Sequence, residues 1–138
     1  MGSNRVCSHS ITLYNYVGEN DAGKAQYVAT LLTGVHVRAS KGISSGDTSK
    51  DAARVHIFDD TAICDKTFMP HDEWAAAEDS VKAQHWTLDQ TGMDYFAIGD
   101  TGISEGSLPT HLTLFRINEI SRKELGSRRM WHWRIDAR

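Results

Sequence analysis

The chain has 138 residues, 40% of them hydrophobic and 24% charged, which is typical of a single ordinary globular domain. Its formal net charge of −3 gives no overall electrostatic reason to bind nucleic acid. No apolar run is long enough to span a bilayer and no signal-peptide pattern is present, so we expect no membrane partner. The two cysteines, Cys7 and Cys64, show no CxxC spacing and are expected to be free thiols in a reducing compartment.

The first half of the chain is predicted to form a series of short strands. Apolar and polar residues alternate over residues 10–17 (SITLYNYV), and the turn-rich GENDAGK segment that follows favours a hairpin. Residues 25–32 and 35–39 are predicted as two separate strands, because Thr33 and Gly34 interrupt the pattern between them. Residues 53–58 (ARVHIF) are the next predicted strand.

Two segments are expected to be flexible. Residues 40–51 (SKGISSGDTSKD) are polar and rich in glycine and serine, which predicts a long exposed loop. Residues 1–9 are expected to be a flexible N-terminus, and their MGSN start is typical of an expression remnant. We therefore expect a single domain over residues 10–136.

The second half of the chain contains the only predicted helix and the longest strand-like runs. Residues 71–82 follow Pro70 and combine three consecutive alanines with early acidic residues, which predicts a short helix. Short strands are predicted at residues 85–88 and 93–98, and longer ones in THLTLFRINEI and MWHWRIDAR. Together these elements predict a mainly β fold, a small antiparallel β-barrel or sandwich of seven to nine short strands.

The final run alternates strictly, and this predicts which side chains face the core. Trp131, Trp133 and Ile135 are expected on one face. The opposite, solvent-facing side is expected to carry His132, Arg134 and Asp136.

Histidines are the residues that most invite a metal-site hypothesis. His36, His56 and His132 each lie mid-strand between apolar neighbours, so their side chains should point to the face opposite those neighbours. Convergence of the three would make a metal site, but no HxH, HExxH or Cys/His cluster is present, and surface or rim histidines are the preferred interpretation. No catalytic motif is found either, so no catalytic residue, metal or other cofactor is predicted.

The connector SRKELGSRR is the clearest candidate contact surface. Its basic residues are Arg122, Lys123, Arg128 and Arg129. They would suit an acidic protein surface or a nucleic-acid backbone, while an ordinary solvated hairpin is an equally weighted alternative. Aromatic residues that could stack on single-stranded nucleic acid are Tyr14, Tyr16, Trp131 and Trp133, although core packing is the preferred interpretation.

Several stretches together resemble a known protein family. They are residues 11–15 (ITLYN), Lys24, residues 41–42 (KG), residues 86–88 (WTL), residues 94–99 (DYFAIG) and residues 126–133 (GSRRMWHW). In these pieces the chain resembles small minor capsid or head–tail connector proteins of siphoviruses and of prophages in Gram-positive bacteria. The closing GSRRMWHW stretch is the most specific of them.

This resemblance implies a structural role in the virion and, during assembly, in the bacterial cytoplasm. It implies a small β-barrel with long loops and a short helix, which forms a ring with its own copies, contacts portal, adaptor and tail proteins, and lies near packaged DNA. The residues that we predict for its interfaces are Arg122, Lys123, Arg128, Arg129, Lys41, Ile43, Asp47 and Lys50. The alternative is a small OB-like barrel that binds single-stranded nucleic acid, and an enzyme ranks last.

Overall fold

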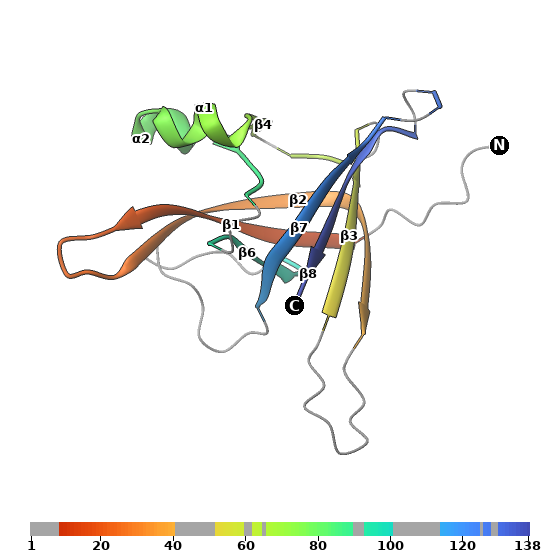
Figure 1. Ribbon diagram of the computed structural model, residues 1–138, viewed down its shortest axis with the longest axis horizontal. Coiled ribbons are helices and arrows are strands. Elements are labelled where there is room, and N and C mark those ends of the chain that lie inside the picture. Colours follow the sequence, from red (N-terminus) through yellow and green to blue (C-terminus); the bar gives the residue numbers. More distant parts are fainter. Residues whose placement is uncertain are drawn as a thin grey trace, which may run out of the picture.

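A computed structural model shows that the chain is built around a closed β-barrel (Figure 1). The structure describes residues 9–40, 52–59, 62–64, 66–89, 93–100, 114–124, 126–127 and 130–138. Its elements are β1 (His9–Glu19), β2 (Ala25–Ser40), β3 (Ala52–Phe58), β4 (Thr67–Phe68), α1 (His71–Ala76), α2 (Asp79–Lys82), β5 (His85–Trp86), β6 (Tyr95–Ile98), β7 (Phe115–Lys123) and β8 (His132–Ala137). The predicted mainly β fold is confirmed.

The barrel contains six antiparallel strands in the order β1-β2-β3-β8-β7-β6. Strands β4 and β5 form a separate parallel pair. Inward positions alternate along each barrel strand, as the pleat of a strand requires. The buried core inside the barrel includes Ile11, Leu13, Leu32, Val35, Val55, Ile57, Phe96, Phe115, Ile117 and Ile135. A packed interior therefore fixes which side chains of each strand face outward.

Strand β2 differs from the prediction because residues 25–40 form one continuous strand instead of two. It pairs with β1 as far as Val35 and with β3 from His36 onward. Gly34 lies at this change of partner and has a φ of 70°, which glycine adopts without the steric penalty of a Cβ. The glycine that suggested a break thus allows the strand to bend at a corner of the barrel.

The predicted helix over residues 71–82 is wrong in one respect, since two short helices replace it. Ala77, between them, has an extended backbone with φ −81° and ψ 160°. The next element explains the break: β5 must return beside β4, with His85 opposite Thr67. A straight helix of this length would carry the chain about 18 Å in one direction, which hinders such a return. Tertiary pairing therefore overrides the helix propensity of the alanines.

The two predicted flexible segments lie mostly outside the residues that the structure describes. Ser40, the first residue of the predicted loop 40–51, is the last residue of β2, and residues 41–51 are outside the described part. At the predicted N-terminal tail, His9 already belongs to β1, where its Nδ1 accepts a hydrogen bond from the Val37 N–H at 3.2 Å. No helix in the described ranges is long and apolar enough to cross a membrane.

Candidate functional site

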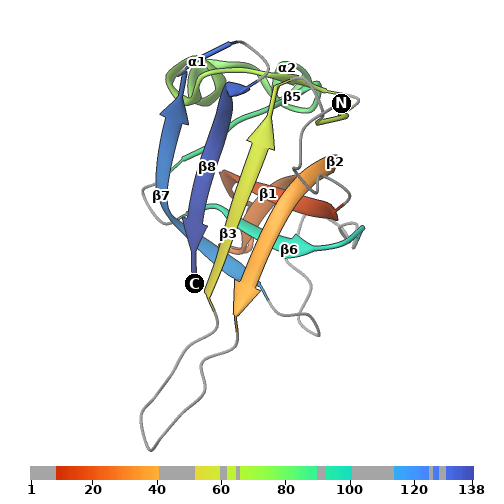
Figure 2. The same ribbon diagram turned by 90° about the vertical axis from the view of Figure 1, so that its right-hand side faces the viewer.

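The outer surface of β2, β3 and β8 gathers basic and histidine side chains. In register, His36 lies opposite His56, which lies opposite Arg134 on the next strand. One step along, Arg38 lies opposite Arg54. We name this surface the histidine–arginine face, and its members are His36, Arg38, Arg54, His56, His132 and Arg134. The strands β2, β3 and β8, which carry it, lie at the front in Figure 2. The predicted outward orientation of His132 and Arg134 agrees with this placement, since Ile135, the residue after Arg134, is buried on the opposite face of β8.

The histidines form a row in which the rings contact one another. Ring centroids are 6.1 Å apart for His9 and His36, 5.6 Å for His36 and His56, and 5.2 Å for His56 and His132. His36, His56 and His132, each predicted to point away from its apolar neighbours, thus lie side by side on one face. Within the described part of the chain, however, no three ligating side chains are arranged to hold a metal ion. Their juxtaposition gives a row of packed rings.

The electrostatics of this face are set by arginine, because the central histidine resists protonation. Burial, followed by the nearby His132, His36, Arg54 and Arg134, lowers the pKa of His56 to about 4. His56 is thus neutral at pH 7. Asp136 forms ion pairs with Arg54, at 2.7 Å, and with Arg134, at 3.3 Å. The arginines and Asp136 leave the face with more positive than negative charge.

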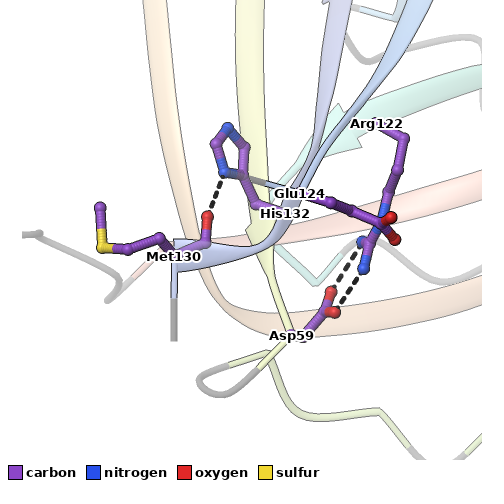
Figure 3. Close-up of polar contacts among 5 residues, drawn as sticks. All are labelled: Asp59, Arg122, Glu124, Met130 and His132. Carbon is purple, nitrogen blue, oxygen red and sulfur yellow. Dashed lines mark hydrogen bonds and ion pairs between the residues drawn. The ribbon is translucent and has the colours of Figure 1, made fainter. Parts of the chain in front are cut away.

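Arg122, from the predicted basic connector, lies near the end of β7 and pairs with acidic side chains of the same chain (Figure 3). Its guanidinium donates to both carboxylate oxygens of Asp59, at 2.8 and 2.5 Å, and its Nε donates to Glu124 at 3.0 Å. The Asp59 hydrogen bonds are the largest cause of the raised pKa of Arg122. The guanidinium also lies over the ring of Trp133, 5.1 Å from its centroid. Arg122 therefore joins β7 to the end of β3.

We expect this bidentate pair to contribute modestly to stability. In a double-mutant cycle of Arg122→Ala and Asp59→Ala, the coupling energy should be about 0.5–1 kcal/mol, because both groups are partly exposed. Arg122→Ala should cost more than Asp59→Ala, since it also removes the contact with Trp133. Urea unfolding of the four proteins measures both quantities. A coupling energy of zero would contradict the assigned pairing.

Of the other predicted interface residues, only Lys123 lies in the part of the chain that the structure describes. Lys123 is half-buried and lies opposite His132 across β7 and β8, at the edge of the histidine–arginine face. His132 Nδ1 lies 2.9 Å from the Met130 carbonyl (Figure 3), so this nitrogen carries the proton that it donates. The predicted residues outside the described ranges are Arg128, Arg129, Lys41, Ile43, Asp47 and Lys50. Their part in an interface stays a prediction.

A second charged surface lies on the two helices. The exposed acidic side chains are Asp72, Glu73, Glu78 and Asp79. We name them the acidic helix patch. None of them has a basic partner at ion-pair distance among the described residues. The nearby Lys82 instead lies over Trp74, 5.2 Å from the ring centroid. Trp74 itself is buried.

A buried polar cluster between β1 and the start of β6 was missed by the sequence interpretation. Asn15 donates from Nδ2 to the Thr87 carbonyl and to Asp94 Oδ2, both at 2.8 Å, and accepts from the Thr87 N–H at 3.3 Å. Asp94 Oδ1 accepts from the Tyr16 N–H at 2.9 Å. The available signal was Asn15, a polar residue in phase with the inward Ile11 and Leu13.

Burial governs the chemistry of this cluster. Asp94 is 1% exposed, and burial raises its pKa to about 6 although the hydrogen bonds from Tyr16 and Asn15 act in the opposite direction. A perturbed carboxyl can mark an active site, but one enclosed in this way offers no surface to a substrate. The cluster therefore connects elements of the fold.

The aromatic residues considered for nucleic-acid stacking do not form one exposed platform. Tyr14 is fully buried, and Tyr16 contacts Tyr27 with centroids 5.6 Å apart. Trp133 packs against the core beneath Arg122. His36 and His56 stack on each other, so the facing sides of these two rings are not free for bases either. The preferred interpretation, core packing, is borne out for Tyr14, and Trp133 packs against the core, but Tyr16 and Trp131 are not among the core residues.

Comparison with known proteins places the chain in one family. The model of DUF6751, described as a family of unknown function, matches residues 6–138. No curated protein gives a significant match, and no solved structure does. Because the match covers nearly the whole sequence, the chain belongs to the family of unknown function DUF6751.

Proposed function

We propose that this protein is a non-enzymatic structural component of a tailed phage or prophage, a minor capsid protein of the head–tail connector or head-closure type. It acts as a ring at the neck of the virion, in contact with portal, adaptor and tail proteins. It resides in the host cytoplasm during assembly. The motifs from ITLYN to GSRRMWHW support this proposal, and so does the small antiparallel barrel that their resemblance implies.

The observation that carries the proposal is the presence of two oppositely charged surfaces on one barrel. The histidine–arginine face lies on the outer side of β2, β3 and β8, whereas the acidic helix patch lies on α1 and α2 at one end (Figure 2). Two different surfaces that attract each other make a heterologous interface, which closes into a ring when the rotation between copies allows it. A single charged surface would instead favour a partner of another kind.

A structural role is also supported by the contacts of Asp94 and Arg122, the residues whose raised pKa values are described above. Asp94 is sealed inside the fold, and Arg122 is held by Asp59 and Glu124. Neither group has the combination of access and poised partner that general acid–base or nucleophilic chemistry needs. Their contacts join strands and loops to one another.

The proposal is tested on tailed particles from the strain that encodes the chain. Mass spectrometry of purified particles should detect the protein, and cross-linking should join it to portal, adaptor or tail proteins. Purified tailed particles without the protein would overturn the proposed function.

Charge reversal of Arg128 and Arg129 to glutamate should block tail attachment while the purified variant keeps the wild-type circular dichroism spectrum and melting temperature, because a basic contact becomes acidic. Electron microscopy would count tailed and tailless particles. Lys24→Glu, on the exposed β1–β2 turn, is the matched control with the same type of charge change. Normal tailed particles from the Arg128 and Arg129 variant would contradict the role of this connector.

A further inference from the structure

The histidine–arginine face contains a depression at one of its ends. The depression, of about 420 Å³, lies where β3 begins and β8 ends. It is lined by Arg38, Ala53, Arg54, Asn118, Glu119, Asp136, Ala137 and Arg138. Its charged lining consists of three arginines and two carboxylates, Glu119 and Asp136, so positive charge is in excess in a concave surface where an added carboxylate can accept bidentate hydrogen bonds from guanidinium groups. We name it the arginine hollow.

Two of its arginines are available for a ligand. Arg54 is bound by Asp136, which Arg134 also neutralises. Across the described ranges, by contrast, no carboxylate lies at ion-pair distance from Arg38 or Arg138. Both of these side chains are exposed. The guanidinium groups of Arg38 and Arg138 thus lie beside the Arg54–Asp136 ion pair without an acidic partner of their own, which is an arrangement suited to an added anion.

The acidic helix patch provides anionic side chains that match the arginine hollow in charge. Within one molecule, however, the patch and the hollow lie too far apart to meet. Asp72 and Glu73 lie in the first turn of α1 and are exposed. The helices lie at the end of the barrel where β3 ends and β8 begins, opposite the hollow (Figure 2). Any contact between these two surfaces must therefore join two copies of the chain.

Resting on the proposed ring assembly, we propose that the arginine hollow of one copy binds the acidic helix patch of the next copy. Arg38 and Arg138 pair with Asp72 and Glu73 of the neighbour. Each copy then donates its helix patch to one neighbour and its hollow to the other, which is the heterologous pattern that a ring or filament requires. Because the pairs lie at an exposed rim, the association is sensitive to salt.

Two charge-reversed variants test this contact without relying on loss of function alone. The hollow variant carries Arg38→Glu and Arg138→Glu, and the helix variant carries Asp72→Lys and Glu73→Lys. Light scattering over a concentration series at low salt should show association of the wild type and weakening by roughly tenfold or more in each variant. An equimolar mixture of the two variants should associate again, because each reversed hollow then meets a reversed helix.

Two single charge reversals on the exposed β1–β2 hairpin, Lys24→Glu and Glu19→Lys, are controls of the same kind with half the change in charge, and both should associate like the wild type. A wild type that stays monomeric at millimolar concentration and low salt overturns the inference, and so does association that neither variant weakens. A mixture that fails to restore association also overturns it. These outcomes are separate from the proposed function, which fails only if tailed particles lack the protein.

Discussion

Asn15→Ala is expected to lower the free energy of unfolding by about 3–5 kcal/mol, a large part of the roughly 5–15 kcal/mol typical of a domain. Asn15 is fully buried and satisfies both the N–H and the carbonyl of Thr87 as well as Asp94 Oδ2. Alanine leaves all three groups without this partner, in a place that water does not replace without cost. Urea unfolding followed by fluorescence and by circular dichroism measures the change.

Gln26→Ala provides the matched amide control for that experiment. Gln26 also lies in a strand, but its side-chain bonds to the carbonyls of Lys24 and Ala25, at 3.4 and 3.1 Å, are longer than the two 2.8 Å bonds that Asn15 donates, and they lie near the surface. Its removal should change stability by no more than about 0.5 kcal/mol. If Asn15→Ala costs no more than this control, Asn15 does not hold the buried cluster together.

The variants Asp94→Asn and His56→Gln are expected to change the slope of stability against pH in opposite directions. The pKa of Asp94 is raised from 3.8 to about 6, so between these values the folded state holds a proton that the unfolded state has released. Asp94 therefore adds stability as the pH falls through about 6, amounting to about 2.5 kcal/mol by pH 4. Stability from this group is correspondingly lost as the pH rises.

His56 acts with the opposite sign in almost the same window. Its pKa is lowered from 6.5 to about 4, so on acidification the unfolded state takes up the proton first and the folded state loses stability. In the wild-type protein the contributions of Asp94 and His56 to the pH dependence of stability therefore oppose each other. Replacing one of these residues should reveal the contribution of the other.

Urea unfolding at a series of pH values from 4.5 to 7 tests this opposition. Asp94→Asn should make stability fall more steeply on acidification than in the wild type, whereas His56→Gln should make it rise. The double variant should return toward the wild-type slope, which separates titration from any constant loss caused by altered hydrogen bonds. Parallel profiles for all four proteins would contradict the assigned burial of both groups.

Local patterns predicted strands and their faces well where one face is buried. The alternation of β8 placed Ile135 in the core and His132 and Arg134 on the outer face. The same rule predicted that His36 and His56 point outward, because their neighbours Val35, Val55 and Ile57 are apolar. Such predictions succeed because the period of a strand is a property of its own backbone.

Patterns failed where the neighbour of a segment decides its shape. Gly34 was interpreted as a break, but β2 continues through it because the barrel supplies β1 on one side of this point and β3 on the other. The alanine run around Ala77 favours helix locally, yet the return of β5 to β4 divides it. Neither neighbour is adjacent in sequence, so neither signal is local.

Hydrophobic alternation and turn residues were enough to predict the mainly β class of fold, the hairpin between β1 and β2, and the outward placement of the strand histidines and of Arg134. These features depend on residues that lie close together in the sequence. The pairing of Arg122 with Asp59, the contact of Asn15 with Asp94, and the common hollow of Arg38 and Arg138 depend on the three-dimensional fold. Closure of the barrel sets which distant strands become neighbours, and therefore which charges are paired within the chain and which remain available for a partner.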